Sequence, residues 1–150
     1  MIISGILTGE ISSSYIYLIS YSQYIYIGET GSHPAVRWGN HLGKRGTFLV
    51  NLYEMEGEQL SSEEDIFFIS IKCNEIDCED VYKRKIARRA VEAELHRSYA
   101  LNPDVFGPDS RIISRPPSDP VWQSFRFDPC TIAKEIYSEI SKRYQEWKLS

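Results

Sequence analysis

A small set of residues in this chain carries side chains suited to hydrolysing a phosphate ester. A phenol can serve as a general base only if its pKa of about 10 is lowered by a nearby cation. A guanidinium stays charged and offers fixed donors to a phosphate oxygen. A lone glutamate is enough to hold Mg²⁺, because this ion keeps several waters and needs only about one or two protein carboxylates. The candidate residues are Tyr17, Tyr26, Gly28, Arg37, His41, Glu92 and Asn102.

Both candidate tyrosines and the glycine fall on a predicted β-hairpin. Residues 15–19 and 24–28 are runs of β-branched and aromatic residues, and the polar segment between them can reverse the chain. Side chains alternate across a strand, so the tyrosines of each run share one face of the sheet. Gly28 lets a ligand or another backbone approach closely. A cross-strand ladder of aromatic rings that only stabilises the sheet is the simpler alternative.

A short helix would carry the arginine and the histidine. Ser32 is a candidate cap and Pro34 stands just inside the first turn, which predicts a helix over about residues 35–42. Arg37 and His41 lie four residues apart and therefore project from one face of this helix. A solvated pair on the protein surface explains the same spacing.

A longer helix is predicted over about residues 81–100. Asp80 can cap its start, and Asn102 with Pro103 fixes its end. This helix carries Glu92, another of the candidate residues. Asn102 has an alternative role as a simple helix terminator.

The remaining segments complete a small α+β fold. Residues 66–73 form a nearly continuous apolar run, which predicts a central strand buried on both faces. Residues 48–53 could form a short helix or a strand, residues 54–65 an acidic surface loop, and residues 103–120 an irregular proline-rich loop. We expect one domain over residues 1–150, with a roughly three-stranded antiparallel sheet flanked by helices and a C-terminal helical extension.

The last predicted helix follows Asp128 and Pro129 and has an apolar stripe at helical spacing. We expect this stripe to be a packing face within the chain, and a homodimer formed through it is the alternative. The stripe consists of Ile132, Ile136, Ile140, Tyr144 and Trp147.

The composition is that of an ordinary globular protein, with 42% hydrophobic and 25% charged residues. The formal net charge is −4, so no overall positive field favours nucleic acid. The three cysteines lack the paired spacing of a zinc site, and no segment resembles a signal peptide or a membrane span. We therefore expect a cytoplasmic protein that does not contact membranes. The residues that could form a local positive surface are Lys44, Arg45, Lys83, Arg84, Lys85, Arg88 and Arg89.

The order and spacing of the candidates resemble the GIY-YIG nuclease superfamily. Residues 26–28 (Tyr-Ile-Gly) are the second half of that signature. Residues 15–17 (Tyr-Ile-Tyr) stand where the first half belongs, with Tyr15 in place of the usual glycine. Arg37 matches the arginine of the family's first helix, and His41 matches the histidine found four residues later in some branches.

The resemblance continues on the second helix. Residues 91–99 are similar to the segment that carries the family's metal-binding glutamate, and Asn102 matches the asparagine that often closes it. We choose Glu92 as this glutamate because the family-like spacing depends on it, and Glu94 is the second choice. The resemblance covers about residues 14–102 and leaves the C-terminal third outside.

The resemblance implies a metal-dependent endonuclease that hydrolyses phosphodiester bonds in DNA, with Mg²⁺ or Mn²⁺ as cofactor and RNA as an open alternative substrate. The alternative is a nucleic-acid-binding or interaction module with this fold and little or no catalytic activity, which the acidic net charge and Tyr15 support. The implied roles are general base for Tyr17, phosphate-orienting hydroxyl for Tyr26, phosphate clamp for Arg37, metal ligand for Glu92, positioning of Tyr17 or water for His41, and support of neighbouring groups for Asn102.

Overall fold

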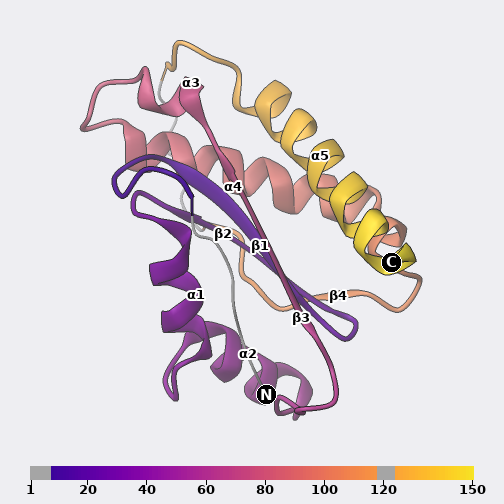
Figure 1. The fold of residues 1–150 in the computed structure, drawn as a ribbon. Helices are drawn as coiled ribbons and strands as arrows, with labels where there is room; N and C mark the ends of the chain where they lie inside the picture. Colours follow the sequence, from indigo (N-terminus) through magenta and orange to yellow (C-terminus); the bar gives the residue numbers. More distant parts are fainter. Residues whose placement is uncertain (1–7, 118–123) are drawn as a thin grey trace.

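The computed structural model describes residues 8–117 and 124–150 and has the predicted α+β class (Figure 1). Its strands form one sheet, and helices pack on both faces of that sheet. In chain order the described elements are β1 (Tyr15–Tyr21), β2 (Tyr24–Thr30), α1 (Pro34–Leu42), α2 (Thr47–Glu56), β3 (Ile66–Lys72), α3 (Asn74–Asp77), α4 (Arg84–Leu101), the 3-10 helix η1 (Pro103–Phe106), β4 (Arg111–Ile112) and α5 (Pro129–Leu149).

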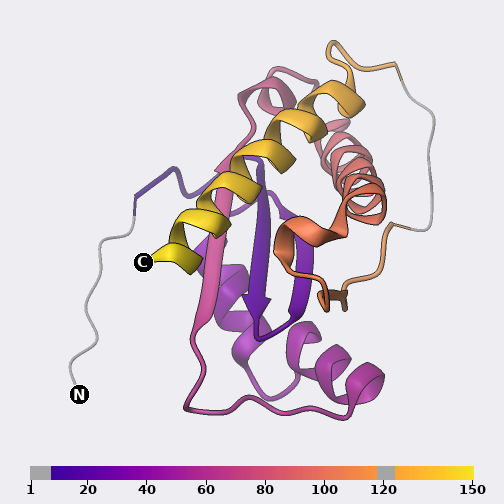
Figure 2. The same cartoon turned by 90° about the vertical axis from the view of Figure 1, so that its right-hand side faces the viewer.

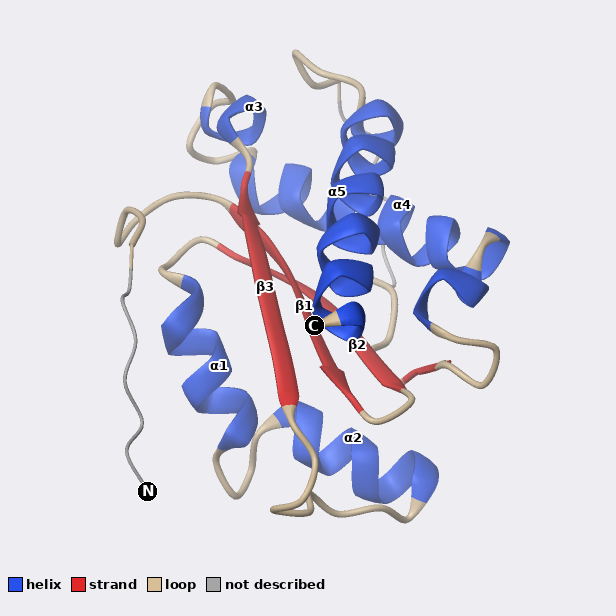
Figure 3. Ribbon diagram, turned by 45° about the vertical axis from the view of Figure 1, so that its right-hand side comes forward, coloured by secondary structure: helices blue, strands red, loops and turns tan. Residues whose placement is uncertain are grey.

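The sheet has four strands in the order β3-β1-β2-β4 (Figure 3). β1 pairs antiparallel with β2 and β3, whereas β4 lies parallel to β2 and pairs only with Tyr24 and Ile25. The prediction of about three antiparallel strands was therefore wrong. β4 falls in the segment predicted as an irregular loop, and its two residues are too few to give a periodic signal.

The central strand of the helix-covered sheet is β1 rather than β3. Residues 66–73 were predicted to be central, and this was wrong because β3 pairs only with β1 and forms an edge of the sheet. The apolar residues of β3 are half-buried, whereas all seven residues of β1 are buried. An apolar run therefore identified a strand with two covered faces, but it did not reveal the strand's open edge.

Two hydrophobic cores, one on each face of the sheet, hold the layers together (Figures 1 and 2). On one face, Ile16 and Leu18 pack with α4 and α5. The predicted apolar stripe of α5 faces this core, so it packs within the chain as expected. On the other face, Tyr17 and Tyr26 pack with Phe48 of α2 and with α1. The alternation predicted for the hairpin thus places its tyrosines together, under α1 and α2.

Local signals in the sequence located the helix starts to within a few residues. α5 begins directly after Asp128, as predicted, and the Asp128 carboxylate caps it by accepting a hydrogen bond from the amide two residues later. The cap of α1 is His33 rather than Ser32. Asp80 caps a preceding turn, so α4 begins only at Arg84. No described helix has the combination of length and hydropathy that a bilayer span requires.

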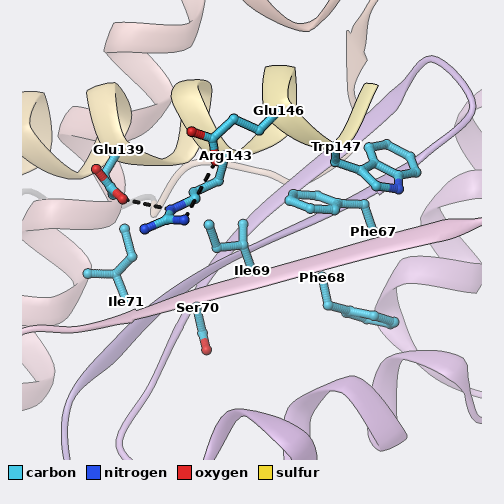
Figure 4. A pocket seen from close by; sticks show the side chains of 9 residues that line it. All are labelled: Phe67, Phe68, Ile69, Ser70, Ile71, Glu139, Arg143, Glu146 and Trp147. Carbon is cyan, nitrogen blue, oxygen red and sulfur yellow. Dashed lines mark hydrogen bonds and ion pairs between the residues drawn. The ribbon is translucent and has the colours of Figure 1, made fainter. Parts of the chain in front are cut away.

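A groove lies between β3 and α5, on the face of the sheet opposite the tyrosines (Figure 4). Phe67 stacks on Trp147 at one end, with ring centroids 4.9 Å apart. Arg143 bridges Glu139 and Glu146 at 2.9 and 3.6 Å. The one arginine and two glutamates that line this groove therefore form an ion-pair network with a net negative charge.

Candidate active site

The phenol of Tyr17 reaches across β2 because Gly28 has no side chain. The two residues are cross-strand partners in the β1–β2 register. A Cβ placed on Gly28 would clash with the phenol oxygen and ring of Tyr17. Glycine at this position therefore lets a side chain of the central strand reach toward the outer edge of β2.

His41 and Tyr26 complete the surroundings of this phenol. The Nε2 atom of His41 lies 2.7 Å from the Tyr17 hydroxyl oxygen. The Tyr26 ring meets the imidazole edge-on at 4.6 Å and stacks beside the Tyr17 ring at 6.4 Å between centroids. Tyr17 is 1% exposed and His41 is 2% exposed, so the alternative of a solvated surface pair is wrong for His41.

Arg37 approaches the same phenol from one turn earlier on α1. Its guanidinium is half-buried, and its hydrogen bond and charge act to lower the pKa of Tyr17. Burial has the larger effect, so the pKa of Tyr17 is raised overall. Burial also raises the pKa of Tyr26 far above its ordinary value. Both phenols are therefore neutral at pH 7 in the metal-free protein, while the buried Nε atom of Arg37 has no partner among the described residues.

α4 packs against β2 beyond the point where β4 ends. On this helix, Nε2 of His96 lies 2.9 Å from Oγ of Ser114, which accepts a hydrogen bond from the amide of Ile27 at 2.9 Å. Two helical turns earlier, Arg88 pairs with Glu29 of β2 at 2.5 Å. The turn of α4 between these two contacts therefore faces the end of β2 that β4 leaves uncovered.

That turn carries Glu92, which is half-buried. Burial, and after it the charge of Glu29, raise its pKa from 4.5 to about 8 against the opposing charges of Arg89 and Arg37. The same carboxylate acts electrostatically on both phenols. Glu94 instead pairs with the exposed Arg97 at 2.6 Å. Glu92, and not Glu94, is therefore the carboxylate of α4 whose charge acts on the tyrosines.

The structure does not bring Asn102 to this cluster. Asn102 is exposed at the C-terminal end of α4, and its carbonyl accepts a hydrogen bond from the Tyr137 hydroxyl at 2.7 Å. It lies ten residues after Glu92 on one helix, which at about 1.5 Å per residue is about 15 Å along the helix axis. Its position agrees with the alternative role of a helix terminator.

Some members of the site region were not identified from the sequence. Glu29 follows the signature glycine directly, a position that could have pointed to it. Arg88 was predicted to belong to a positive surface, but it forms an ion pair with Glu29. Arg84 was predicted to belong to the same surface, but it donates hydrogen bonds to carbonyls of α3 and of the turn that follows it. Ser114 lies in the proline-rich segment, where no pattern singled it out.

Glu92 provides a single carboxylate ligand, which suits a divalent cation that keeps most of its bound water molecules. Across residues 8–117 and 124–150, no group of three or more His, Cys, Asp or Glu side chains is arranged to hold a metal ion. A divalent cation beside Glu92 would offset both the burial of this carboxylate and its repulsion by Glu29. A single carboxylate is sufficient for Mg²⁺.

Comparisons of the chain with protein-family models, with curated proteins and with solved structures find no match. The functional interpretation therefore depends on the cluster itself. Two phenols from neighbouring strands, a guanidinium from α1 and a carboxylate from α4 act on one another electrostatically at the outer edge of β2.

Proposed function

We propose that this chain is a metal-dependent endonuclease of the GIY-YIG type that hydrolyses phosphodiester bonds in DNA. The observation that carries the proposal is the meeting of Tyr17, Arg37 and Glu92 at the end of β2 that β4 leaves uncovered. Arg37 and Glu92 are more exposed than the phenol between them, so a phosphate reaches the cluster from their side.

Each residue has a role that its surroundings support. Arg37 would bind a non-bridging phosphate oxygen, because its side chain is only half-buried and its guanidinium stays charged. Tyr26 would orient the phosphate by donating a hydrogen bond from its hydroxyl, since its raised pKa keeps the phenol neutral. Tyr17, once ionised to the phenolate, would accept a proton from the water that attacks phosphorus as the P–O bond to the leaving group breaks. Glu92 would hold Mg²⁺ or Mn²⁺, which when bound polarises the phosphate and assists departure of the leaving oxygen.

The positive charge available for the DNA backbone is smaller than the sequence predicted. Arg84 and Arg88 make intramolecular contacts. Exposed cations follow α1 at Lys44 and Arg45, and Lys85 lies at the start of α4. The salt dependence of DNA binding scales with the number of phosphate contacts, so we expect weak non-specific binding whose salt dependence is shallower than the full predicted set of cations would give.

A nicking assay on supercoiled plasmid in Mg²⁺ tests this function. Glu92→Gln should abolish nicking, and Arg37→Ala should slow it by about 100-fold. Glu94→Gln is the matched control, since it makes the same substitution on the same helix at a carboxylate that pairs with Arg97. Nicking that survives in both Glu92→Gln and Arg37→Ala would reject the assignment and identify a contaminating nuclease.

The second candidate function is a nucleic-acid-binding module with little activity. It is favoured by the 1% exposure of Tyr17 and by the raised pKa of its phenol. Fluorescence anisotropy with labelled DNA duplexes and single strands separates the two functions. Salt-dependent binding without any Mg²⁺-dependent product would establish the module and exclude the enzyme.

A further inference from the structure

The two ring nitrogens of His41 have different partners, and these partners fix which nitrogen carries the proton. The amide of Phe48 donates to Nδ1 at 3.2 Å, and Nε2 lies 2.7 Å from the hydroxyl oxygen of Tyr17. A backbone amide can only donate, so Nδ1 must present its lone pair. In a neutral imidazole the ring proton is then on Nε2 and points at Tyr17.

The fold holds the Phe48 amide in this place. Phe48 lies in the first turn of α2, where backbone amides lack partners within the helix, and the helix has no side-chain cap of its own at Gly46. A Cβ on Gly46 would clash with the carbonyls of His41 and Asn40, so glycine allows α2 to begin directly against the end of α1. The Phe48 ring is 0% exposed and anchors that first turn. His41 thus supplies the missing cap of α2.

We propose that the first turn of α2 fixes His41 as a hydrogen-bond donor to Tyr17, so that His41 positions the phenol oxygen and does not receive its proton. This inference rests on the proposed function for its catalytic meaning. Arg37 also hydrogen-bonds to Tyr17, and a guanidinium can only donate, so it cannot accept the hydroxyl proton either. On ionisation the proton leaves to solvent, and the two donors stay on the phenolate oxygen.

The surroundings of His41 keep it neutral in this role. Burial, together with the charge of Arg37, lowers the pKa of His41 to about 4. A second proton on the ring would have to sit on Nδ1, where it would face the Phe48 amide. The rings of Tyr17 and Tyr26 also pack against the imidazole, with centroids 5.6 and 4.6 Å from it.

A long-range ¹H–¹⁵N NMR spectrum of the full chain at pH 7 tests the tautomer directly. The chain has three histidines. His96 serves as an internal reference, because its contacts require the other tautomer. Nδ1 of His96 lies 2.9 Å from the carbonyl of Glu92, which can only accept, so His96 must be protonated on Nδ1. We expect a protonated Nε2 for His41 beside a protonated Nδ1 for His96. A protonated Nδ1 on His41 would overturn the proposal, whether or not the protein cleaves DNA.

Two substitutions of His41 separate positioning from folding. In His41→Asn the amide oxygen can occupy the place of Nδ1 and accept from Phe48, but nothing donates to Tyr17. In His41→Gln the amide nitrogen can reach the place of Nε2 and donate to Tyr17, while the cap of α2 is lost. We expect His41→Asn to lose about 10–100-fold in cleavage rate, with the rising limb of its pH–rate profile displaced to higher pH. His41→Gln should be less stable but keep the parent's profile.

These outcomes decide between positioning and a structural role. A His41→Asn variant that cleaves as fast as His41→Gln, with an unshifted pH profile, would reject positioning of Tyr17. A parent protein that does not cleave DNA at all would reject the proposed function, and the NMR spectrum would still decide the tautomer.

Discussion

The replacement of Glu92 by glutamine should stabilise the metal-free protein, and the gain should grow with pH. The pKa of Glu92 is about 8 in the folded protein and 4.5 in an unperturbed glutamate. The raised pKa means that the folded protein favours the protonated carboxyl. The contribution of Glu92 to the free energy of unfolding is therefore fully present below about pH 4.5 and is lost as the pH rises to about 8. Glutamine does not titrate and suffers no such loss.

The magnitude of this effect follows from the two pKa values. At about 1.36 kcal/mol per pH unit, ionising Glu92 costs about 1 kcal/mol of folding free energy at pH 5, about 3 at pH 7 and about 5 well above pH 8. The side chain is half-buried, so solvent screening reduces these values. We expect the difference in free energy of unfolding between Glu92→Gln and the parent to rise by about 2 kcal/mol between pH 5 and pH 8.

Urea unfolding in EDTA at four pH values between 5 and 8 measures this difference. Glu94→Gln is the control, since Glu94 lies on the same helix in an ion pair with Arg97, and its difference from the parent should stay flat. Millimolar Mg²⁺ should raise the stability of the parent at pH 8 and leave Glu92→Gln unchanged, because only the parent offers the ligand. A pH-independent difference, or a Glu92→Gln protein less stable than the parent at pH 8, would refute the placement of Glu92 in a buried, charge-repelling site.

Three further substitutions test other parts of the structure. Gly28→Ala should lower the free energy of unfolding by about 1–3 kcal/mol, because the new Cβ clashes with Tyr17. The same substitution should abolish nicking. A variant as stable as the wild type in urea would contradict the finding that the Tyr17 phenol crosses over β2. Ser114→Ala should cost about 1–3 kcal/mol because it leaves the amide of Ile27 without an acceptor, and Ser114→Thr is the variant that should restore the bond. Asn102→Ala should leave the nicking rate within about twofold of the parent, since Asn102 lies about 15 Å along α4 from the cluster; a large loss would place it in the site.

The sequence predicted the parts of the fold that local physics controls. Alternation in the hairpin correctly grouped its tyrosines on one face, and Asp128 correctly marked the start of α5. The position of a strand within the sheet depends instead on pairing between distant segments. The run at 66–73 therefore identified β3 but not its place at the edge, and nothing in two residues of β4 could predict a parallel partner for β2.

The same division applies to the candidate site. Residues fixed by local spacing, such as Arg37 and His41 one helical turn apart, do project from one face toward Tyr17. Residues that depend on how α4 lies against β2 were harder to identify. Glu29 gains its influence on the site only because α4 packs beside it. The choice between Glu92 and Glu94 likewise needed the orientation of α4.

The tyrosine and the histidine of the candidate site are also among the most deeply buried residues of the second core. In many enzymes the reactive groups sit on loops and the scaffold beneath them can be strengthened independently. In the proposed enzyme, reactivity and packing would be properties of the same side chains. Selection for thermal stability would therefore favour larger or more apolar residues at the positions that the proposed chemistry needs. We expect heat-resistant variants of this protein to have lost their catalytic activity.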